Sequence, residues 1–282
     1  ASTPANSTVS IPTSSTIIQP SNSFSTTSTF SYYLPVSNTL SPSFAQRILT
    51  PLIFFTDPST SLFFENFSIY GTSPNGWIFT DGILCYGVWN GGYRNISAYN
   101  VNINAFFYLN HNTAGNSFNL YDLIAYGSHD AYSVAFIFGG YSSHAFAINC
   151  VGGFSYGLMT DQNPDGNNNY YSLNLAARTY AILNMAGYIK VFGGGTGYGN
   201  GGAMYQSGGN SQFYSFTFNN ADSTNGFPNI YDTSGHSALL FDGCIFVPSN
   251  GTTKTPYAWQ SNGSQVIFRD CVVVNADLYT NF

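Results

Sequence analysis

A short apolar pattern recurs along most of the chain and limits its possible folds more than any other feature. In one series, a polar or small residue precedes an apolar residue inside a strand-like run. The series is Asn66-Phe67, Asn95-Ile96, Asp122-Leu123, Asn149-Cys150, Asn174-Leu175, Lys190-Val191, Ser215-Phe216, Gly243-Cys244 and Asp270-Cys271. A second series alternates with it: Cys85, Phe107, Phe136, Leu158, Leu183, Tyr205, Tyr231 and Trp259. Such self-similarity predicts a solenoid, in which each repeat buries its apolar face against its neighbours.

Within each period the sequence predicts short strands. Runs of apolar or alternating residues are separated by Gly, Asn, Asp and Ser, which is typical of strands and turns. We therefore expect an all-β, single-stranded parallel β-helix of about eight coils over residues 52–282. Tyr70, Tyr99 and Tyr126 recur at one offset, which predicts a stacked ladder with a spacing of about 4.8 Å.

One part of the chain fits this period poorly. The step from Leu175 to Val191 is only 16 residues, which is short for a full coil. The glycine-rich stretch that follows, from Gly193 to Gly202, is expected to bulge from the wall as a loop.

The composition excludes some classes of partner. Of 282 residues, 44% are apolar but only 6% are charged, with 6 basic and 12 acidic side chains. There is no basic surface for nucleic acid, and no apolar run of about 18 residues that would span a membrane. A surface with so few carboxylates changes little in charge at low pH, which suits an acidic habitat, although ordinary secreted adhesins share this composition.

Several features favour an exported protein, at the cell or virion surface or outside the cell. The chain begins at Ala1 in a Ser/Thr/Pro-rich segment, as a mature chain would after cleavage at a small residue. Covalently attached glycans are expected at the sequons, which are Asn6, Asn66, Asn95, Asn250 and Asn262.

The region before the repeats divides into two parts. Residues 1–42 are rich in Ser, Thr and Pro, and either form a disordered leader or an extended arm with strand-forming segments. Residues 43–51 are predicted to form a helix that caps the first coil. Ser43 would cap this helix, Phe44 and Ile48 would share one face, and Pro51 would end it.

The coil length and phase of residues 64–282 resemble those of the pectin-lyase-like superfamily of right-handed parallel β-helices. The resemblance is one of architecture and involves no diagnostic motif. This superfamily includes polysaccharide lyases and hydrolases, phage tailspikes and bacterial adhesins, so the resemblance implies a fold and leaves the function open.

The sequence offers little for catalysis. A glycoside hydrolase needs converging carboxylates, and a lyase needs calcium ligands with a nearby basic residue. No Asp-Asp pair and no Gly-His-Gly motif is present. We expect no catalytic site, no metal and no cofactor. A cluster of Asp122, Asp242 or Asp270 with Arg269 in one groove would instead favour an enzyme.

The cysteines leave two alternatives open. Cys244 and Cys271 occupy equivalent positions in adjacent coils, where their Cα atoms would lie within disulfide range. Buried thiols packed as small apolar groups fit the same positions equally well. No Cys-x-x-Cys spacing points to zinc.

The two ends of the predicted solenoid suggest a function. The last apolar strand has no helix or charged segment after it, and an unpaired strand edge invites further pairing. Strand addition by the arm of a neighbouring copy would give a head-to-tail polymer. The candidate residues for this contact are Val9, Ile11, Ile17, Ile18, Tyr32, Tyr33, Leu34, Val272, Val274, Leu278 and Phe282.

We therefore expect a structural subunit of an extracellular filament or surface appendage, with copies of itself as its partner. A glycan-binding adhesin or viral spike protein is the first alternative, because exposed tyrosine rings could pack on sugars. A polysaccharide lyase or hydrolase is the second.

Overall fold

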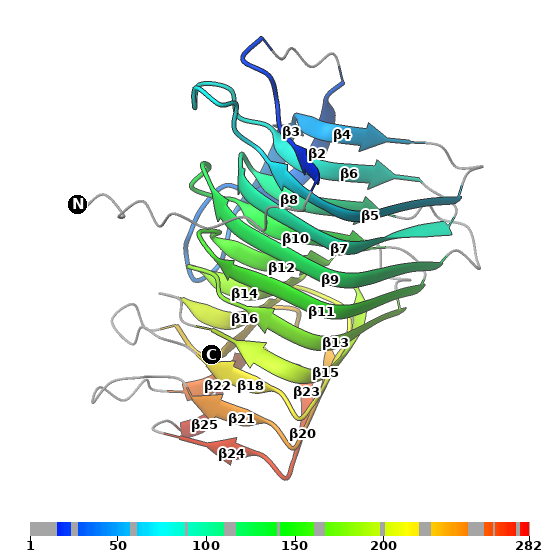
Figure 1. Ribbon diagram of the computed structural model, residues 1–282. Coiled ribbons are helices and arrows are strands. Elements are labelled where there is room, and N and C mark those ends of the chain that lie inside the picture. The colour runs from blue at the N-terminus through cyan, green and yellow to red at the C-terminus, as the bar shows by residue number, and fades with distance from the viewer. Residues whose placement is uncertain are drawn as a thin grey trace.

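The computed structural model describes residues 16–23, 28–56, 61–87, 90–109, 117–139, 142–160, 167–197, 201–219, 227–247, 257–261, 263–274 and 277–281. In these ranges the chain winds into an all-β parallel β-solenoid (Figure 1), which confirms the predicted fold class and is consistent with a right-handed parallel β-helix. Within the same ranges, no helix has the length and apolar character of a membrane span.

One wall of the solenoid is a ten-stranded parallel sheet, here called sheet I. Its strands follow one another along the solenoid in chain order. They are β4 (Pro51–Phe55), β6 (Asp81–Tyr86), β8 (Asn104–Leu109), β10 (Val134–Gly139), β12 (Tyr156–Thr160), β14 (Tyr180–Asn184), β16 (Gly202–Gln206), β19 (Ile230–Asp232), β22 (Tyr257–Ser261) and β25 (Asp277–Asn281).

The opposite wall is a thirteen-stranded parallel sheet, here called sheet II. Its main path is β1 (Thr16–Ile18), β5 (Ser61–Tyr70), β7 (Asn90–Val101), β9 (Ser117–Ser128), β11 (Ser142–Gly152), β13 (Asn167–Leu175), β15 (Tyr188–Thr196), β17 (Ser211–Tyr214), β20 (Ala238–Asp242) and β23 (Gln265–Arg269). In the later coils, β18 (Thr217–Asn219), β21 (Ile245–Val247) and β24 (Val272–Val273) continue it.

A residue with positive φ bends sheet II in each of its coils from β5 onward. These corner residues are Asn66, Asn95, Asp122, Ala147, Ser172, Gly193, Ser215, Gly243 and Asp270. Asn, Asp and Gly tolerate this left-handed conformation best. The corners divide sheet II into a first half before the bend and a second half after it.

The corner residues show that the pattern read from the sequence was assigned to non-equivalent positions in the middle coils. Leu175 lies opposite Thr196, and Val191 lies opposite Tyr170. Leu175 and Val191, which are 16 residues apart, therefore do not occupy equivalent positions in successive coils. The full coil there runs 21 residues between the corners Ser172 and Gly193, and the described glycines up to Gly195 belong to strand β15 instead of a loop.

Stacked aromatic side chains fill much of the interior. The rings of Phe213 and Phe241 lie 5.6 Å apart, and those of Phe241 and Phe268 lie 5.2 Å apart. The predicted tyrosine ladder is confirmed as a stack for its first pair, whereas the second pair is tilted by 52°. Tyr99 stacks on Tyr70 at 5.1 Å, and its ring lies 6.4 Å from that of Tyr126.

An antiparallel hairpin covers the outer face of sheet I. It consists of β2 (Phe30–Pro35) and β3 (Phe44–Leu49). Leu34 and Leu49 are fully buried in a cluster with sheet I residues such as Phe107 and Ile137. From β6 to β16, both faces of sheet I are therefore buried, which explains why these strands are mostly apolar.

The capping helix predicted over residues 43–51 is wrong, because residues 44–49 form strand β3. Leu49 is buried whereas Ile48 is 61% exposed, as strand alternation requires. The Ser43 amide donates to Ser37 Oγ, and the Ser43 carbonyl accepts from Val36. Ser43 thus helps to close the hairpin turn, and docking on sheet I outweighs the local helical pattern.

Candidate functional site

Of the acidic and basic candidates, the structure brings Arg269 and Asp242 together and leaves Asp122 apart. Arg269 donates to Asp242 at 3.2 Å on adjacent strands of sheet II. Asp122 lies on β9, and four strands separate β9 from β20, the strand that carries Asp242. Within the described residues, no group of three or more His, Cys, Asp or Glu side chains could hold a metal ion.

The ion pair between Arg47 and Asp130 helps to hold the hairpin on the solenoid. Arg47 Nη2 donates to Asp130 Oδ2 at 2.5 Å, and Nη1 donates to the carbonyls of Pro35 and Tyr132 at 3.3 and 3.2 Å. Tyr180 Oη donates to the carbonyl of Leu40 at 2.7 Å. These contacts join the hairpin to its own solenoid.

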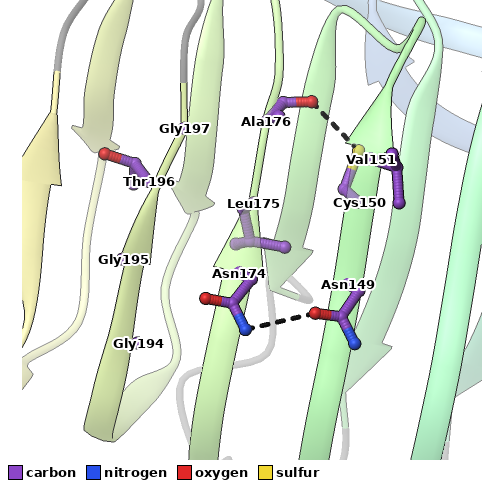
Figure 2. A pocket seen from close by; sticks show the side chains of 10 residues that line it. All are labelled: Asn149, Cys150, Val151, Asn174, Leu175, Ala176, Gly194, Gly195, Thr196 and Gly197. Atoms are coloured by element: carbon purple, nitrogen blue, oxygen red, sulfur yellow. Dashed lines mark hydrogen bonds between the residues drawn. The ribbon is translucent and has the colours of Figure 1, made fainter.

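A groove of about 460 Å³ runs across the second half of sheet II. Figure 2 shows the amides of Asn149 and Asn174 side by side, and Asn174 Nδ2 donates to Asn149 Oδ1 at 3.1 Å. In the next coil Gly195 takes the equivalent position. The groove exists because this row of amide side chains ends at Gly195, which has no side chain.

Five aromatic rings form a ladder on the outer face of sheet II. The ladder consists of Tyr121, Phe146, Tyr171, Phe192 and Tyr214, which are direct neighbours in register. Successive centroids are 5.0, 4.6, 5.0 and 5.0 Å apart with interplanar angles of 12° or less. Each inner ring therefore covers its neighbours' faces and presents only an edge outward. Since sugars pack on ring faces, this ladder does not provide the sugar-binding face expected for an adhesin.

Two of the five sequons lie in the described part of the chain. Asn66 and Asn95 are exposed at adjacent corners, and Asn95 Nδ2 donates to Asn66 Oδ1 at 3.0 Å. The sequons Asn6, Asn250 and Asn262 lie outside the described residues.

Cys244 and Cys271 are free thiols in the structure. The two thiols donate to the carbonyls of Phe213 and Phe241, at 3.5 and 3.4 Å. Burial raises the pKa of Cys244 to about 11.

The two ends of the solenoid carry unpaired strand edges. At the N-terminal end the outermost strands are β4 in sheet I and β1 in sheet II, and at the other end they are β25, β23 and β24. In the described part of the chain, no further strand pairs with these edges. Exposed apolar side chains accompany both ends, namely Ile17 and Phe63 at one and Ile267, Val272 and Val274 at the other.

The structure places the predicted polymerisation residues in three groups. Ile17 and Ile18 pair with the chain's own β5, and Val272 and Val274 lie at the opposite end. Tyr32 and Leu34 pack on their own sheet I, while Tyr33 stacks on Phe44. Leu278 lies in β25, and Val9, Ile11 and Phe282 are outside the described residues.

Two exposed apolar residues at these ends were not among the predicted contact residues. Phe63 and Ile267 are 64% and 58% exposed. They occupy the same row of the first half of sheet II, on its first and last strands. Each is an apolar residue three positions before a corner, in a row whose middle strands hold polar residues such as Asn119, Asn169 and Gln212.

No family model, curated protein or solved structure matched this chain in three comparisons.

Proposed function

We propose that this protein is a structural subunit whose copies associate head to tail into an extracellular filament or surface appendage. The observation that carries the proposal is the pair of open ends. In the described part of the chain, both sheets finish in unpaired strands, and exposed apolar side chains accompany the ends of sheet II. Such edges are templates for pairing with another chain. Two different surfaces meet in this contact, and because successive copies would stack along the solenoid axis, repetition extends the assembly instead of closing it into a ring.

The N-terminal arm takes part in this contact. Its strand β1 forms the outermost edge of sheet II, so the arm borders the joint in the proposed filament. The proposed glycans are attached at exposed sequons such as Asn95, on the corner of the wall, and serve the solubility of a weakly charged surface. The winding of the coils supports kinship with the pectin-lyase-like superfamily as part of this proposal.

The test is electron microscopy and sedimentation of the purified full-length protein over a range of concentrations. We expect filaments that lengthen as concentration rises. Deletion of residues 1–23 removes β1 but leaves the hairpin on sheet I, so the variant should keep its circular dichroism spectrum and remain monomeric. A wild-type protein that stays monomeric at all concentrations would contradict the proposal.

Glycan binding is the second candidate, and the groove of Figure 2 is the observation in its favour. Its paired amides offer hydrogen bonds to hydroxyl groups above a glycine floor. Binding on a glycan array that Asn174→Ala abolishes, with assembly unchanged, would support this candidate.

A further inference from the structure

Within the described residues, the two ends of the solenoid are stepped in opposite senses. At the N-terminal end, β1 extends the second half of sheet II one strand beyond β5, whereas sheet I stops at β4, in the same coil as β5. At the C-terminal end, β25 extends sheet I one strand beyond β22. Sheet II stops there at β23 and β24, in the same coil as β22.

We propose that these steps interlock between copies of this chain. In the joint, β24 of one copy lies beside β1 of the next copy, while β25 lies beside β4. Each end supplies the strand that the other lacks, so the second half of sheet II and sheet I continue without interruption. This inference rests on the proposed function and adds the register of its contact.

The register of sheet II decides which side chains would meet. One outward-facing row runs from Ile17 through Ser68 and continues coil by coil to Ile245 and Val272. Its two end members, Ile17 and Val272, are 43% and 54% exposed. Beside them, the half-buried Ile18 and Val273 end the inward-facing row. The joint removes both apolar pairs from water, which favours association.

Sheet I gives a matching register. The row of Ile53 passes through Ile83 and ends with Trp259 and Tyr279. Tyr279 of one copy therefore lies opposite Ile53 of the next. Ile53 belongs to the partly buried rim of the core, so a strand laid beside β4 would complete its burial.

Charge favours a second copy in the head-to-tail orientation. The outward row of the first half of sheet II begins with Glu65 and Arg94 and ends with Asp242 and Arg269. Across the joint, Arg269 thus faces Glu65, two strand spacings or roughly 9.6 Å away. This spacing is about one Debye length at 0.1 M salt, so opposite charges on one row still attract weakly. End-to-end contact of two like ends would instead bring together ends that carry the same charges.

Cysteine pairs distinguish this joint from the alternative in which β23 lies directly beside β5. All variants carry Cys271→Ser, so that no native thiol lies next to position 272. Ile17→Cys protein mixed with Val272→Cys protein would place the two Cα atoms about 4.8 Å apart, within disulfide range. Phe63→Cys mixed with Ile267→Cys would leave them two spacings apart, which is beyond that range. Ile17→Cys mixed with Val151→Cys, an exposed position on the wall, is the matched control.

We expect a covalent dimer only from the first mixture after mild oxidation, and an axial repeat of ten strand spacings, about 48 Å, in the filaments. Crosslinking of Phe63→Cys with Ile267→Cys, or a repeat of nine spacings, would overturn the stepped joint. Filaments that crosslink in neither mixture would also overturn it while leaving the proposed function standing. Absence of any assembly would instead contradict the proposed function itself.

Discussion

Single polar side chains hold neighbouring coils in register. The buried carboxylate of Asp81 on β6 accepts from the amide of Thr50, which precedes β4, at 2.6 Å. It also accepts from the amides of Ile103 and Asn104, at the start of β8, at 2.8 Å each. One side chain thus joins three successive coils. Burial raises the pKa of Asp81, although these donors and Arg47 act in the opposite direction.

This pKa predicts an unusual pH dependence. Because the pKa is higher in the folded state, the contribution of Asp81 to stability is fully present below its unfolded pKa and is lost as pH rises through its folded pKa. Asp81→Asn removes this contribution and turns an N–H donor toward Thr50, which costs roughly 1–3 kcal/mol. Urea unfolding should show a larger gap between wild type and variant at pH 3 than at pH 7. An equal gap at both values would contradict the prediction.

The cysteines make a second prediction at this scale. Burial raises the pKa of Cys85 and Cys150 to about 12, so their thiolates are scarce at neutral pH. Cys271 is only half-buried. Iodoacetamide at pH 8 should therefore label Cys271 first, as mass spectrometry can show. Labelling of Cys271 that appears only after reduction would instead support its disulfide with Cys244.

At the scale of elements, stacked side chains fix the alignment of strands that have few charges to do so. The outer aromatic ladder links five strands from β9 to β17 through ring contacts. A slip of one residue in any strand would break these contacts and also turn inward-facing residues outward. The ladder therefore contributes to register as well as to stability.

Removing a middle ring should cost more than removing an end ring. Tyr171→Ala loses two stacked pairs, with Phe146 and Phe192, whereas Tyr121→Ala loses one. At about 0.5–1.5 kcal/mol for each pair, we expect Tyr171→Ala to lower the free energy of unfolding by about 1–3 kcal/mol. Tyr121→Ala should lower it by about half as much in the same denaturant titration. Equal losses would show that the rings act independently.

At the scale of the whole molecule, the solenoid is polar. All strands within sheet I and within sheet II run parallel, and the strands exposed at the two ends are different. In the proposed filament, the C-terminal end of each subunit therefore contacts the N-terminal end of the next subunit.

This polarity predicts that a variant defective at one end terminates growth. Val272→Lys places a charge at the C-terminal end, opposite Ile17 of the next copy, but leaves the N-terminal end intact. Added to wild type at one part in ten, it should join filaments through its intact end and shorten them, as measured by electron microscopy. Ser215→Lys, an exposed corner substitution on the wall, should leave the length unchanged. Unaltered lengths with Val272→Lys would contradict head-to-tail growth through this strand.

Much of the fold was predictable from the sequence because local residue patterns specify it. A repeat of 25 to 29 residues with strand-forming runs between Gly, Asn and Asp specified a parallel solenoid and the Tyr70–Tyr99 contact. Corners such as Asn66 and Asn95 were visible because these residues tolerate positive φ. Where Ala147 and Ser172 take the corner, that signal disappears, and the sequence pattern slipped out of phase.

Only the tertiary structure decided how the segment before the repeats is used. Residues 44–49 carry a helical pattern, yet docking against sheet I makes them a strand. The pairing of Ile17 with Ser68 joins residues 51 positions apart, and no local pattern encodes such a contact. Sequence by itself therefore determined the coil, because each repeat contacts only its neighbours. Long-range packing determined the hairpin that covers sheet I and the stepped ends of the solenoid.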